Sequence, residues 1–337
     1  MTQEDLEGIA RKLVKKPKGI LAMDESSGTI KQRFESVGLE NTAENRRAYR
    51  EMLITTPSLG EYISGVILFT ETLNQKTSDG KPFVEILKEE GIIVGVKVDL
   101  GTRPYPNFPD ELVTDGIDGL AKRIAEYTQQ GAKFAKCRAV FSIYGNERPT
   151  KAVINANAQR FGEYAPICQN EGLVPIVEPE VLMDGSHSLE DCMRVTYDVL
   201  SMVFNKLLEN RINFKAMILK TNIVVPGNES KVSYSPDEVA EKTVRVLKST
   251  VPEDIPGIAF LSGDLSDEDA TTYLNVMNQR YAIELPWNLT FSFNRGLTRE
   301  PRKIWAQGGP DNFKNAQRML LQRAKETSLA TEGKYQA

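Results

Sequence analysis

The chain has 337 residues, of which 40% are hydrophobic and 26% charged, and 42 Lys plus Arg against 46 Asp plus Glu give a formal net charge of −4. This composition is sufficient for a large buried core and excludes a wholly disordered chain, which would combine low hydrophobicity with high net charge. The mildly acidic balance offers no basic stripe for a phosphate backbone, so we expect no nucleic-acid partner.

The N-terminal segment and the cysteines favour a cytoplasmic protein. Residues 1–19 contain acidic side chains and lack the apolar core of a secretory signal, and no stretch reaches the roughly 18 apolar residues that a membrane span needs. Cys137, Cys168 and Cys192 have no CxxC spacing, which fits reduced thiols. We therefore expect a cytoplasmic protein with no membrane attachment and no disulfides.

His187 is the only histidine in the chain. Catalytic zinc sites and Ser/His or Cys/His triads depend on this residue type. His187 lies in the polar run 184–188, where the pattern favours a surface loop before a helix. We therefore predict a protein that uses no metal and no other cofactor.

Short apolar runs, each followed by turn residues and then a helical pattern, predict repeated βα units around a parallel sheet. Eight such runs occur, at residues 19–23, 65–70, 92–98, 132–138, 174–180, 216–222, 257–263 and 289–293. Eight is the strand number of a TIM (β/α)8 barrel, and no Gly/Ser-rich linker divides the chain. We predict a single α/β domain over 1–337, a TIM barrel with extra N-terminal helices in 1–18 and 30–62.

Several helix starts carry a capping serine followed three residues later by an acidic residue. They are Ser188 with Asp191, Ser235 with Glu238, and Ser266 with Asp269. A last helix is expected to begin at Asp311 or Asn312 and to run toward Leu329. The proline-rich segment 101–110 predicts an irregular loop after the third strand.

Polar side chains stand at or just past the end of every predicted strand. In barrel enzymes the catalytic residues come from these carboxyl ends, because the loops that follow them converge on one pocket. The candidates in chain order are Asp24, Glu71, Asp99, Lys136 with Arg138, Glu178 with Glu180, Lys220, Ser262, and Ser292 with Arg295.

Lys220 lies inside the apolar run 216–222, where an unpaired ammonium is costly. Cations such as Lys136 and Arg138 on another strand would favour its neutral amine, the nucleophile that forms an imine with a ketone. The alternative is a lysine paired with a carboxylate in a structural ion network. The pattern alone leaves both interpretations open.

Glu178 and Glu180 stand two residues apart and would share one face of a strand. One of them could deliver the proton that imine formation requires, while the other anchors a cation. A solvated pair at the strand end is disfavoured by the apolar residues 174–177 that precede them.

Two segments after the last predicted strands could hold a phosphate. Residues 261–264 precede a capped helix whose N-terminus favours an anion, and residues 292–296 add a hydroxyl and a guanidinium. Barrels often place a phosphate site after strands seven and eight. The sequence therefore predicts a phosphate site at this end of the barrel.

A chain of motifs resembles class I fructose-1,6-bisphosphate aldolase, the Schiff-base type, along nearly the entire length. The motifs are GILAMDESSGTIKQR, FAKCR, VPIVEPEVLMDGSHSLEDC, ILKTNIVVPG, GIAFLSG and PWNLTFSFNRGL. The resemblance implies reversible, metal-independent cleavage of fructose 1,6-bisphosphate to dihydroxyacetone phosphate and glyceraldehyde 3-phosphate in glycolysis and gluconeogenesis. It also implies a homotetramer.

The resemblance also implies roles for the catalytic candidates. Lys220 would form the imine, Glu178 would be the acid/base of carbinolamine dehydration with Glu180 alongside, and Asp24 would take the C4 hydroxyl proton. Lys136 would stabilise negative charge on intermediates, and Arg138 would pair with Glu180 or its neighbours.

For the phosphorylated ketose, the resemblance implies two binding groups. Ser262, Gly263, Ser292 and Arg295 match the positions that bind the ketose phosphate. Ser26 and Thr29 match the hydroxyls that bind the other phosphate.

Three departures from the family pattern stand out. Leu100 replaces a lysine that contacts the second phosphate, and Arg103 or Arg33 is the candidate replacement. Asn294 replaces a glycine, and Tyr335 does not correspond to the family's tail tyrosine. Because of Leu100, another phosphorylated ketose remains an alternative substrate, either sedoheptulose 1,7-bisphosphate or fructose 1-phosphate. A further alternative is a non-catalytic barrel that acts as a scaffold.

Overall fold

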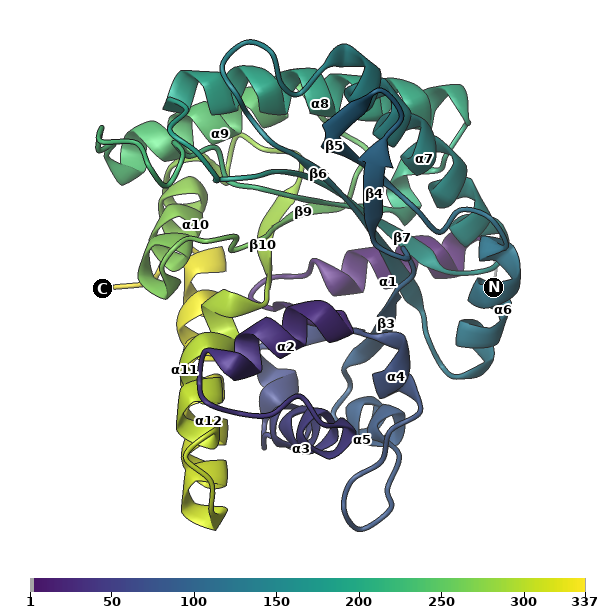
Figure 1. Ribbon diagram of the computed structural model, residues 1–337, viewed down its shortest axis with the longest axis vertical. Helices are drawn as coiled ribbons and strands as arrows, with labels where there is room; N and C mark the ends of the chain where they lie inside the picture. Colours follow the sequence, from purple (N-terminus) through teal and green to yellow (C-terminus); the bar gives the residue numbers. More distant parts are fainter. Residues whose placement is uncertain (1–2, 337) are drawn as a thin grey trace.

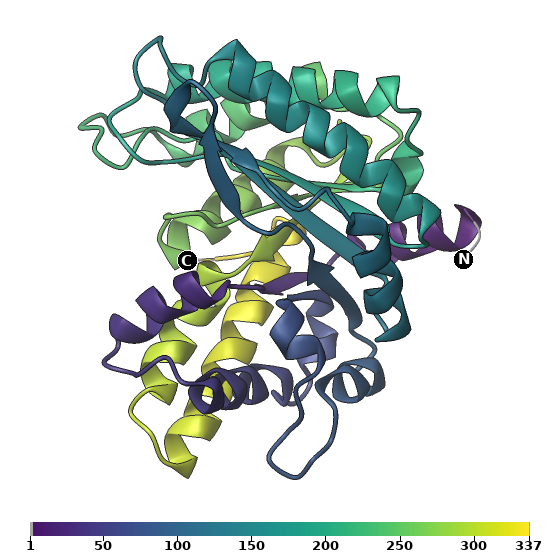
Figure 2. The same cartoon turned by 45° about the vertical axis from the view of Figure 1, so that its right-hand side comes forward.

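The computed structural model describes residues 3–336 and is built around a closed barrel of eight parallel strands (Figures 1 and 2). The barrel strands are β1 Gly19–Met23, β2 Ile63–Leu68, β3 Ile93–Lys97, β6 Phe134–Phe141, β7 Val174–Val181, β8 Ile218–Thr221, β9 Gly257–Phe260 and β10 Asn288–Phe293. Each barrel strand pairs with the strands that precede and follow it around the ring, and β10 closes onto β1. The predicted TIM barrel and its eight strands are confirmed.

The strands are apolar runs because both of their faces are covered, by the barrel interior on one side and by helices on the other. All residues of β1, β2, β7, β8 and β9 are buried. An alternating apolar and polar pattern, typical of a sheet with one wet face, would leave polar groups without partners here.

The amino-terminal end of the barrel is filled by side chains and by α1 (Gln3–Leu13). The Phe134 ring lies where a Cβ on Gly95 would approach it to 2.2 Å, so this position accepts only glycine without rearrangement. Leu13 at the end of α1 packs in the same way against Gly65. The interior of the barrel is therefore closed at this end.

The remaining helices lie around the barrel, and the early ones confirm the predicted N-terminal additions (Figure 1). They are α2 Ser27–Glu35, α3 Ala43–Ile54, α4 Thr70–Leu73, α5 Phe83–Glu89, α6 Leu120–Gln129, α7 Lys151–Asn170, α8 Leu189–Glu209, α9 Pro236–Thr250, α10 Asp267–Tyr281, α11 Arg295–Trp305 and α12 Pro310–Thr331, with short 3-10 turns at η1 Leu59–Glu61 and η2 Phe214–Ala216. Residues 1–2 of the predicted helical segment 1–18 lie outside the described residues. Among residues 3–336, none of the helices has the combined length and apolar character that a membrane crossing requires.

The predicted helix caps are confirmed. The hydroxyls of Ser188, Ser235 and Ser266 each accept a hydrogen bond from the backbone N–H three residues later, and the first two form complete capping boxes. The last helix begins at Pro310, ahead of the predicted Asp311 or Asn312, because proline has the φ angle of a first helical residue and needs no N–H there.

Two predictions about loops are wrong. Segment 101–110 is not irregular, since β4 (Thr102–Tyr105) and β5 (Phe108–Thr114) form an antiparallel ribbon in which an edge position tolerates Pro104. His187 does precede α8, but the residue is only 8% exposed. A second loop covers it, because Gly227 packs against this segment and its N–H donates to the His187 carbonyl.

Candidate active site

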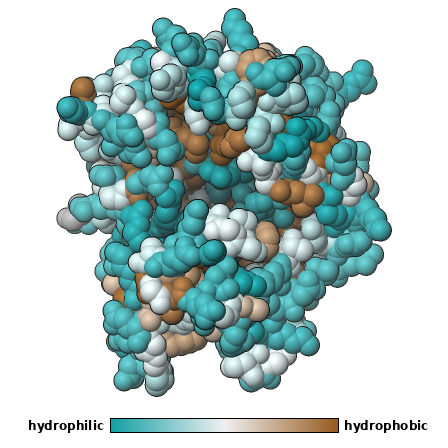
Figure 3. Space-filling model, viewed as in Figure 1, coloured by the Kyte–Doolittle hydropathy of each residue, from teal (hydrophilic) through white to brown (hydrophobic). Residues whose placement is uncertain are grey.

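A cavity of about 790 Å³ opens at the carboxyl ends of the barrel strands. Figure 3 shows a hollow near the middle of this face, next to α2 in the matching view of Figure 1. Of the two strand-end candidates without an implied role, Asp99 lines this cavity, whereas Glu71 does not and pairs with Arg46. The twelve residues to which the resemblance assigns a catalytic or binding role all line the same cavity. They are Asp24, Ser26, Thr29, Lys136, Arg138, Glu178, Glu180, Lys220, Ser262, Gly263, Ser292 and Arg295.

Four charged side chains form a continuous chain of contacts across the cavity floor. Lys220 Nζ lies 2.8 Å from Glu178 Oε1, and Glu178 Oε2 lies 2.8 Å from Lys136 Nζ. Lys136 Nζ also lies 2.7 Å from Asp24 Oδ2. Strands β8, β7 and β6 and the end of β1 therefore bring together an alternating sequence of positive and negative groups. Lys220 combines the two properties that the sequence left as alternatives, since it is paired with a carboxylate and it faces the cavity.

The charges in this chain stabilise one another. Burial alone would raise the pKa of Asp24, but the ammonium groups of Lys136 and then Lys220 outweigh it and hold that pKa below its ordinary value. Burial would likewise lower the pKa of Lys136, but Asp24 and Glu178 raise it. Burial would also raise the pKa of Glu178, but Lys136 and Lys220 outweigh this effect and lower that pKa. Asp24 and Glu178 are therefore carboxylates at neutral pH, and Lys136 is an ammonium.

Glu180 and Arg138 form a second pair at the edge of this chain. The Arg138 Nε donates to Glu180 Oε2 at 2.5 Å, and the Arg138 backbone N–H donates to Asp99 at 3.2 Å. Burial opposes the charged form of Arg138, but Glu180 and Glu178 raise its pKa further. The Glu180 carboxylate is therefore paired with the Arg138 guanidinium, and Glu178 is the carboxylate that contacts Lys220.

Hydroxyls and backbone N–H groups line two regions on either side of the charged chain. Ser26 caps α2 and lies 3.1 Å from the Thr29 hydroxyl, so both stand at a helix N-terminus. On the other side, Ser262 Oγ accepts from the Gly296 N–H at 3.2 Å. The buried Ser292 Oγ has no hydrogen-bond partner among residues 3–336. Each region suits an anion such as a phosphate.

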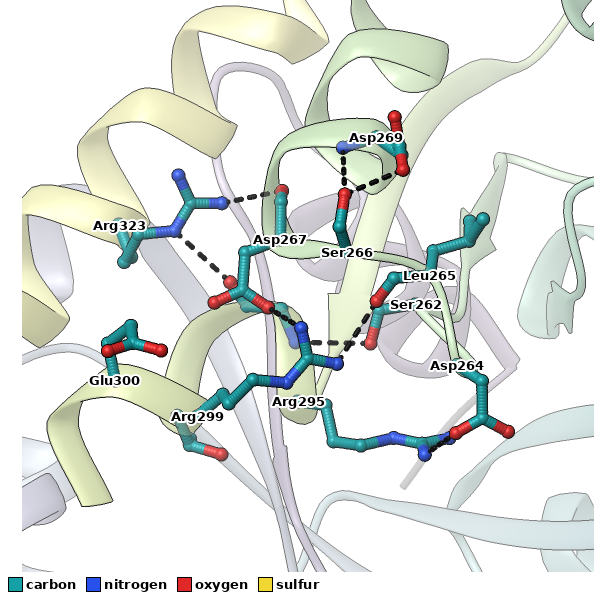
Figure 4. A network of polar contacts seen from close by, with 12 residues as sticks. Ser262, Asp264, Leu265, Ser266, Asp267, Asp269, Arg295, Arg299, Glu300 and Arg323 are labelled. Atoms are coloured by element: carbon teal, nitrogen blue, oxygen red, sulfur yellow. Dashed lines mark hydrogen bonds and ion pairs between the residues drawn. The ribbon is translucent and has the colours of Figure 1, made fainter. Parts of the chain in front are cut away.

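Arg295 begins α11 and extends toward Asp264, with which it forms an ion pair (Figure 4). Burial and the nearby Arg33 guanidinium lower the pKa of Arg295 to about 10. The close-up also shows Arg299 and Arg323, which bind Asp267 and fix the start of α10. The two loops that flank Arg295 are therefore held in place by contacts outside the cavity.

The structure separates the two arginines that could replace the missing lysine at position 100. Arg33 lines the cavity and donates to Asn294 Oδ1, while Asn294 Nδ2 donates to the Ala22 carbonyl at 2.6 Å. Arg103 is not among the residues lining the cavity and pairs with Asp115. Leu100 lines the cavity and the residue is 68% exposed. Asn294 thus anchors Arg33 at the end of β1.

Two charged residues of the site were not among the candidates from the sequence. Lys97 lines the cavity and pairs with Asp99, and Glu25 also lines the cavity while bonding Arg50 at 2.6 Å. Lys97 could have been found by the criterion that singled out Lys220, because it is a lysine within an apolar run. Glu25 follows Asp24 directly, and nothing in the pattern distinguishes it.

No group of three or more His, Cys, Asp or Glu side chains within residues 3–336 is arranged to hold a metal ion. His187 and Tyr335 are not among the residues lining the cavity. The three cysteines are buried and free, and burial raises the pKa of each thiol. The reactive groups of the cavity are therefore amines, carboxylates, guanidinium groups and hydroxyls.

Comparison with known proteins gives consistent results for sequence and structure. The family model described as class I fructose-bisphosphate aldolase matches residues 5–337. The chain is 50% identical over 335 residues to a probable class 1 fructose-bisphosphate aldolase of Xanthomonas axonopodis pv. citri, covering 99% of each chain. It is 49% identical over 319 residues to the cytoplasmic isozyme of fructose-bisphosphate aldolase from Spinacia oleracea, covering 95% of this chain and 88% of that one.

A solved structure gives the same relationship in three dimensions. It is the ternary co-crystal structure of fructose-bisphosphate aldolase from Plasmodium falciparum in complex with TRAP and a small-molecule inhibitor. The TM-score is 0.96 at 47% identity, and the match covers 99% of this chain and 96% of that one.

Proposed function

The chain belongs to the class I fructose-bisphosphate aldolase family, and we propose that it cleaves fructose 1,6-bisphosphate through an imine on Lys220. The observation that carries this proposal is the buried chain of contacts from Lys220 through Glu178 and Lys136 to Asp24. It places a nucleophilic amine, an acid/base group and a second carboxylate around one cavity.

Imine formation begins with attack of the Lys220 amine on the C2 ketone of the substrate. The Glu178 carboxylate, 2.8 Å from Lys220 Nζ, takes up the proton that the lysine loses. In the resulting carbinolamine the nitrogen is uncharged, so Glu178 loses one of the two ammonium groups that lower its pKa. Its tendency to hold a proton therefore rises at the step where it must donate one to the departing hydroxyl.

Cleavage of the C3–C4 bond uses the iminium on Lys220 as the electron acceptor. Asp24 takes the proton from the C4 hydroxyl, C4 becomes the aldehyde of glyceraldehyde 3-phosphate, and the bonding electrons move to the nitrogen to form an enamine. Lys136 keeps Asp24 ionised and so ready to accept that proton. Protonation of the enamine and hydrolysis of the imine then release dihydroxyacetone phosphate and the free amine.

The two anion-binding regions fit the two phosphates of the substrate. We assign the ketose phosphate to Ser262, Gly263, Ser292 and Arg295, and the other phosphate to Ser26, Thr29 and Arg33. Because Leu100 brings no charge to the second phosphate, a ketose without a second phosphate, such as fructose 1-phosphate, is the alternative substrate, and sedoheptulose 1,7-bisphosphate is another. A panel of mono- and bisphosphorylated ketoses, run on the wild type and on Leu100→Lys, decides among them.

The resemblance to the family supports further proposals about the setting of the protein. The similarity to a cytoplasmic isozyme of spinach and a cytosolic one of Arabidopsis thaliana supports a cytoplasmic location. The family resemblance implies a homotetramer of single-domain chains, which light scattering on the purified protein tests. The acidic net charge supports the absence of a nucleic-acid partner.

The Lys220→Met variant tests the catalytic proposal against the scaffold alternative. Methionine keeps the length of the side chain but cannot form an imine, so cleavage falls to the uncatalysed background while the fold, followed by circular dichroism, is retained. Cleavage at the wild-type rate by this variant would remove Lys220 from the mechanism. Absence of cleavage by the wild type would favour a scaffold.

A further inference from the structure

One residue of the region assigned to the ketose phosphate already binds a carboxylate of the protein itself. The Arg295 guanidinium pairs with the Asp264 carboxylate, which follows Gly263 directly (Figure 4). The side chains are 31% and 44% exposed, respectively. The cation assigned to the substrate phosphate is therefore engaged before the substrate arrives.

Asp264 has no other hydrogen-bond or ion-pair partner within residues 3–336. The neighbouring arginines bind other groups instead of Asp264: Arg299 binds the Asp267 side chain, and Arg323 binds backbone carbonyls of α10 and α11. The Asp264 side chain is 44% exposed, so solvent is open to it on one side. Its carboxylate can consequently turn away from Arg295 toward solvent without breaking a second contact.

A carboxylate and a phosphate compete for the same donors. Both are acceptor-only anions that the guanidinium fork binds through paired N–H groups. Two anions beside one guanidinium repel each other, so binding of the phosphate requires Asp264 to leave. The nearby Arg33 guanidinium lowers the pKa of Arg295, whereas the Glu180 carboxylate opposes this effect.

We propose that Asp264 is a specificity-determining residue that competes with the ketose phosphate for Arg295 and thereby sets the affinity for that end of the substrate. This inference rests on the proposed function, because that function assigns Arg295 to the ketose phosphate. A dianionic phosphate displaces the carboxylate, whereas a singly charged group gains little from the exchange. The competition also weakens retention of the phosphate product that carries the ketone.

The condensation reaction separates the two phosphate regions, because its two substrates each carry one phosphate. In Asp264→Asn the competing charge is absent, and the KM for dihydroxyacetone phosphate falls roughly two- to fivefold, the range expected for a partly exposed ion pair. The KM for glyceraldehyde 3-phosphate stays at the wild-type value and kcat does not rise. Inorganic phosphate, used as a competitive inhibitor against dihydroxyacetone phosphate, binds more tightly by the same factor.

Glu268→Gln is the matched control, because it removes the same charge from an exposed position four residues further along the chain. It leaves both KM values unchanged. Asp264→Ser, a second way of removing the carboxylate, reproduces the effect of Asp264→Asn.

Unchanged affinity for dihydroxyacetone phosphate in both Asp264 variants overturns the inference. An equal decrease in Glu268→Gln also overturns it, because the effect would then be one of net charge. Failure of the underlying function gives a different result, since the wild-type protein would then show no condensation and no adduct on Lys220.

Discussion

Lys220 Nζ lies 2.8 Å from Glu178 Oε1, inside the cavity at the carboxyl ends of the barrel strands. The pair comes from neighbouring strands, β8 and β7, whose registry fixes the two side chains on the same face. A lysine that only stabilised the fold would not need to face a cavity lined by further charged groups. The distance also allows direct proton transfer between the two side chains.

Replacement of Glu178 by glutamine should slow imine formation. The amide cannot exchange a proton with the lysine or the departing hydroxyl, so kcat falls by roughly 10²- to 10⁴-fold, the usual contribution of a positioned acid/base group. Rapid-quench measurement of the adduct trapped by borohydride follows the step directly. Glu180→Gln, which removes the partner of Arg138 instead, should reduce the rate of trapping far less. Equal losses in the two variants would contradict the separate roles given to these carboxylates.

The two arginines near Leu100 should differ in their effect on substrate binding. Arg33→Ala removes a cation that lines the cavity and raises the KM for fructose 1,6-bisphosphate roughly tenfold, as expected for loss of a charge-assisted hydrogen bond. Arg103→Ala breaks only the exposed pair with Asp115 and leaves the KM unchanged. Steady-state kinetics on both variants decides between them, and a KM increase confined to Arg103→Ala would reverse the assignment.

Acid should destabilise the fold partly through Glu178. Its pKa in the folded state lies below the ordinary value of 4.5, so its ionised form stabilises the fold above about pH 4.5, and this contribution is lost as the pH falls below that value. Glu178→Gln has no proton to take up. The slope of its unfolding free energy against pH, measured by urea denaturation between about pH 4.5 and 3, should be shallower by up to about 1.4 kcal/mol per pH unit. The same slope in both proteins would show that Glu178 does not titrate with folding.

Activity should persist in excess EDTA. The proposed electron acceptor is the iminium on Lys220, and every polar group assigned to the mechanism is an amine, carboxylate, guanidinium or hydroxyl group. The measurement is the cleavage rate before and after prolonged dialysis against the chelator. A loss of activity that a divalent cation restores would require a different mechanism.

The barrel and the cavity were predictable from local features of the chain. A run such as 174–181 is apolar because it is buried on both faces, and the polar residues that end it must gather where the loops converge. The β4–β5 ribbon was missed because prolines at its exposed edge look like a loop in the sequence. The pair between Asp264 and Arg295 depends on how two loops after β9 and β10 are placed relative to each other, which no local pattern encodes. The burial of His187 was missed for the same reason, because a loop from a distant part of the chain covers it.

The most direct test of the central claim is reductive trapping followed by peptide mapping. Borohydride is added to the wild-type protein during turnover of fructose 1,6-bisphosphate, and the digest is analysed by mass spectrometry. We predict a stable dihydroxyacetone phosphate adduct on the peptide that contains Lys220, loss of activity in proportion to labelling, and no adduct in Lys220→Met. An adduct on another lysine, or full activity after reduction in the presence of substrate, would contradict the mechanism.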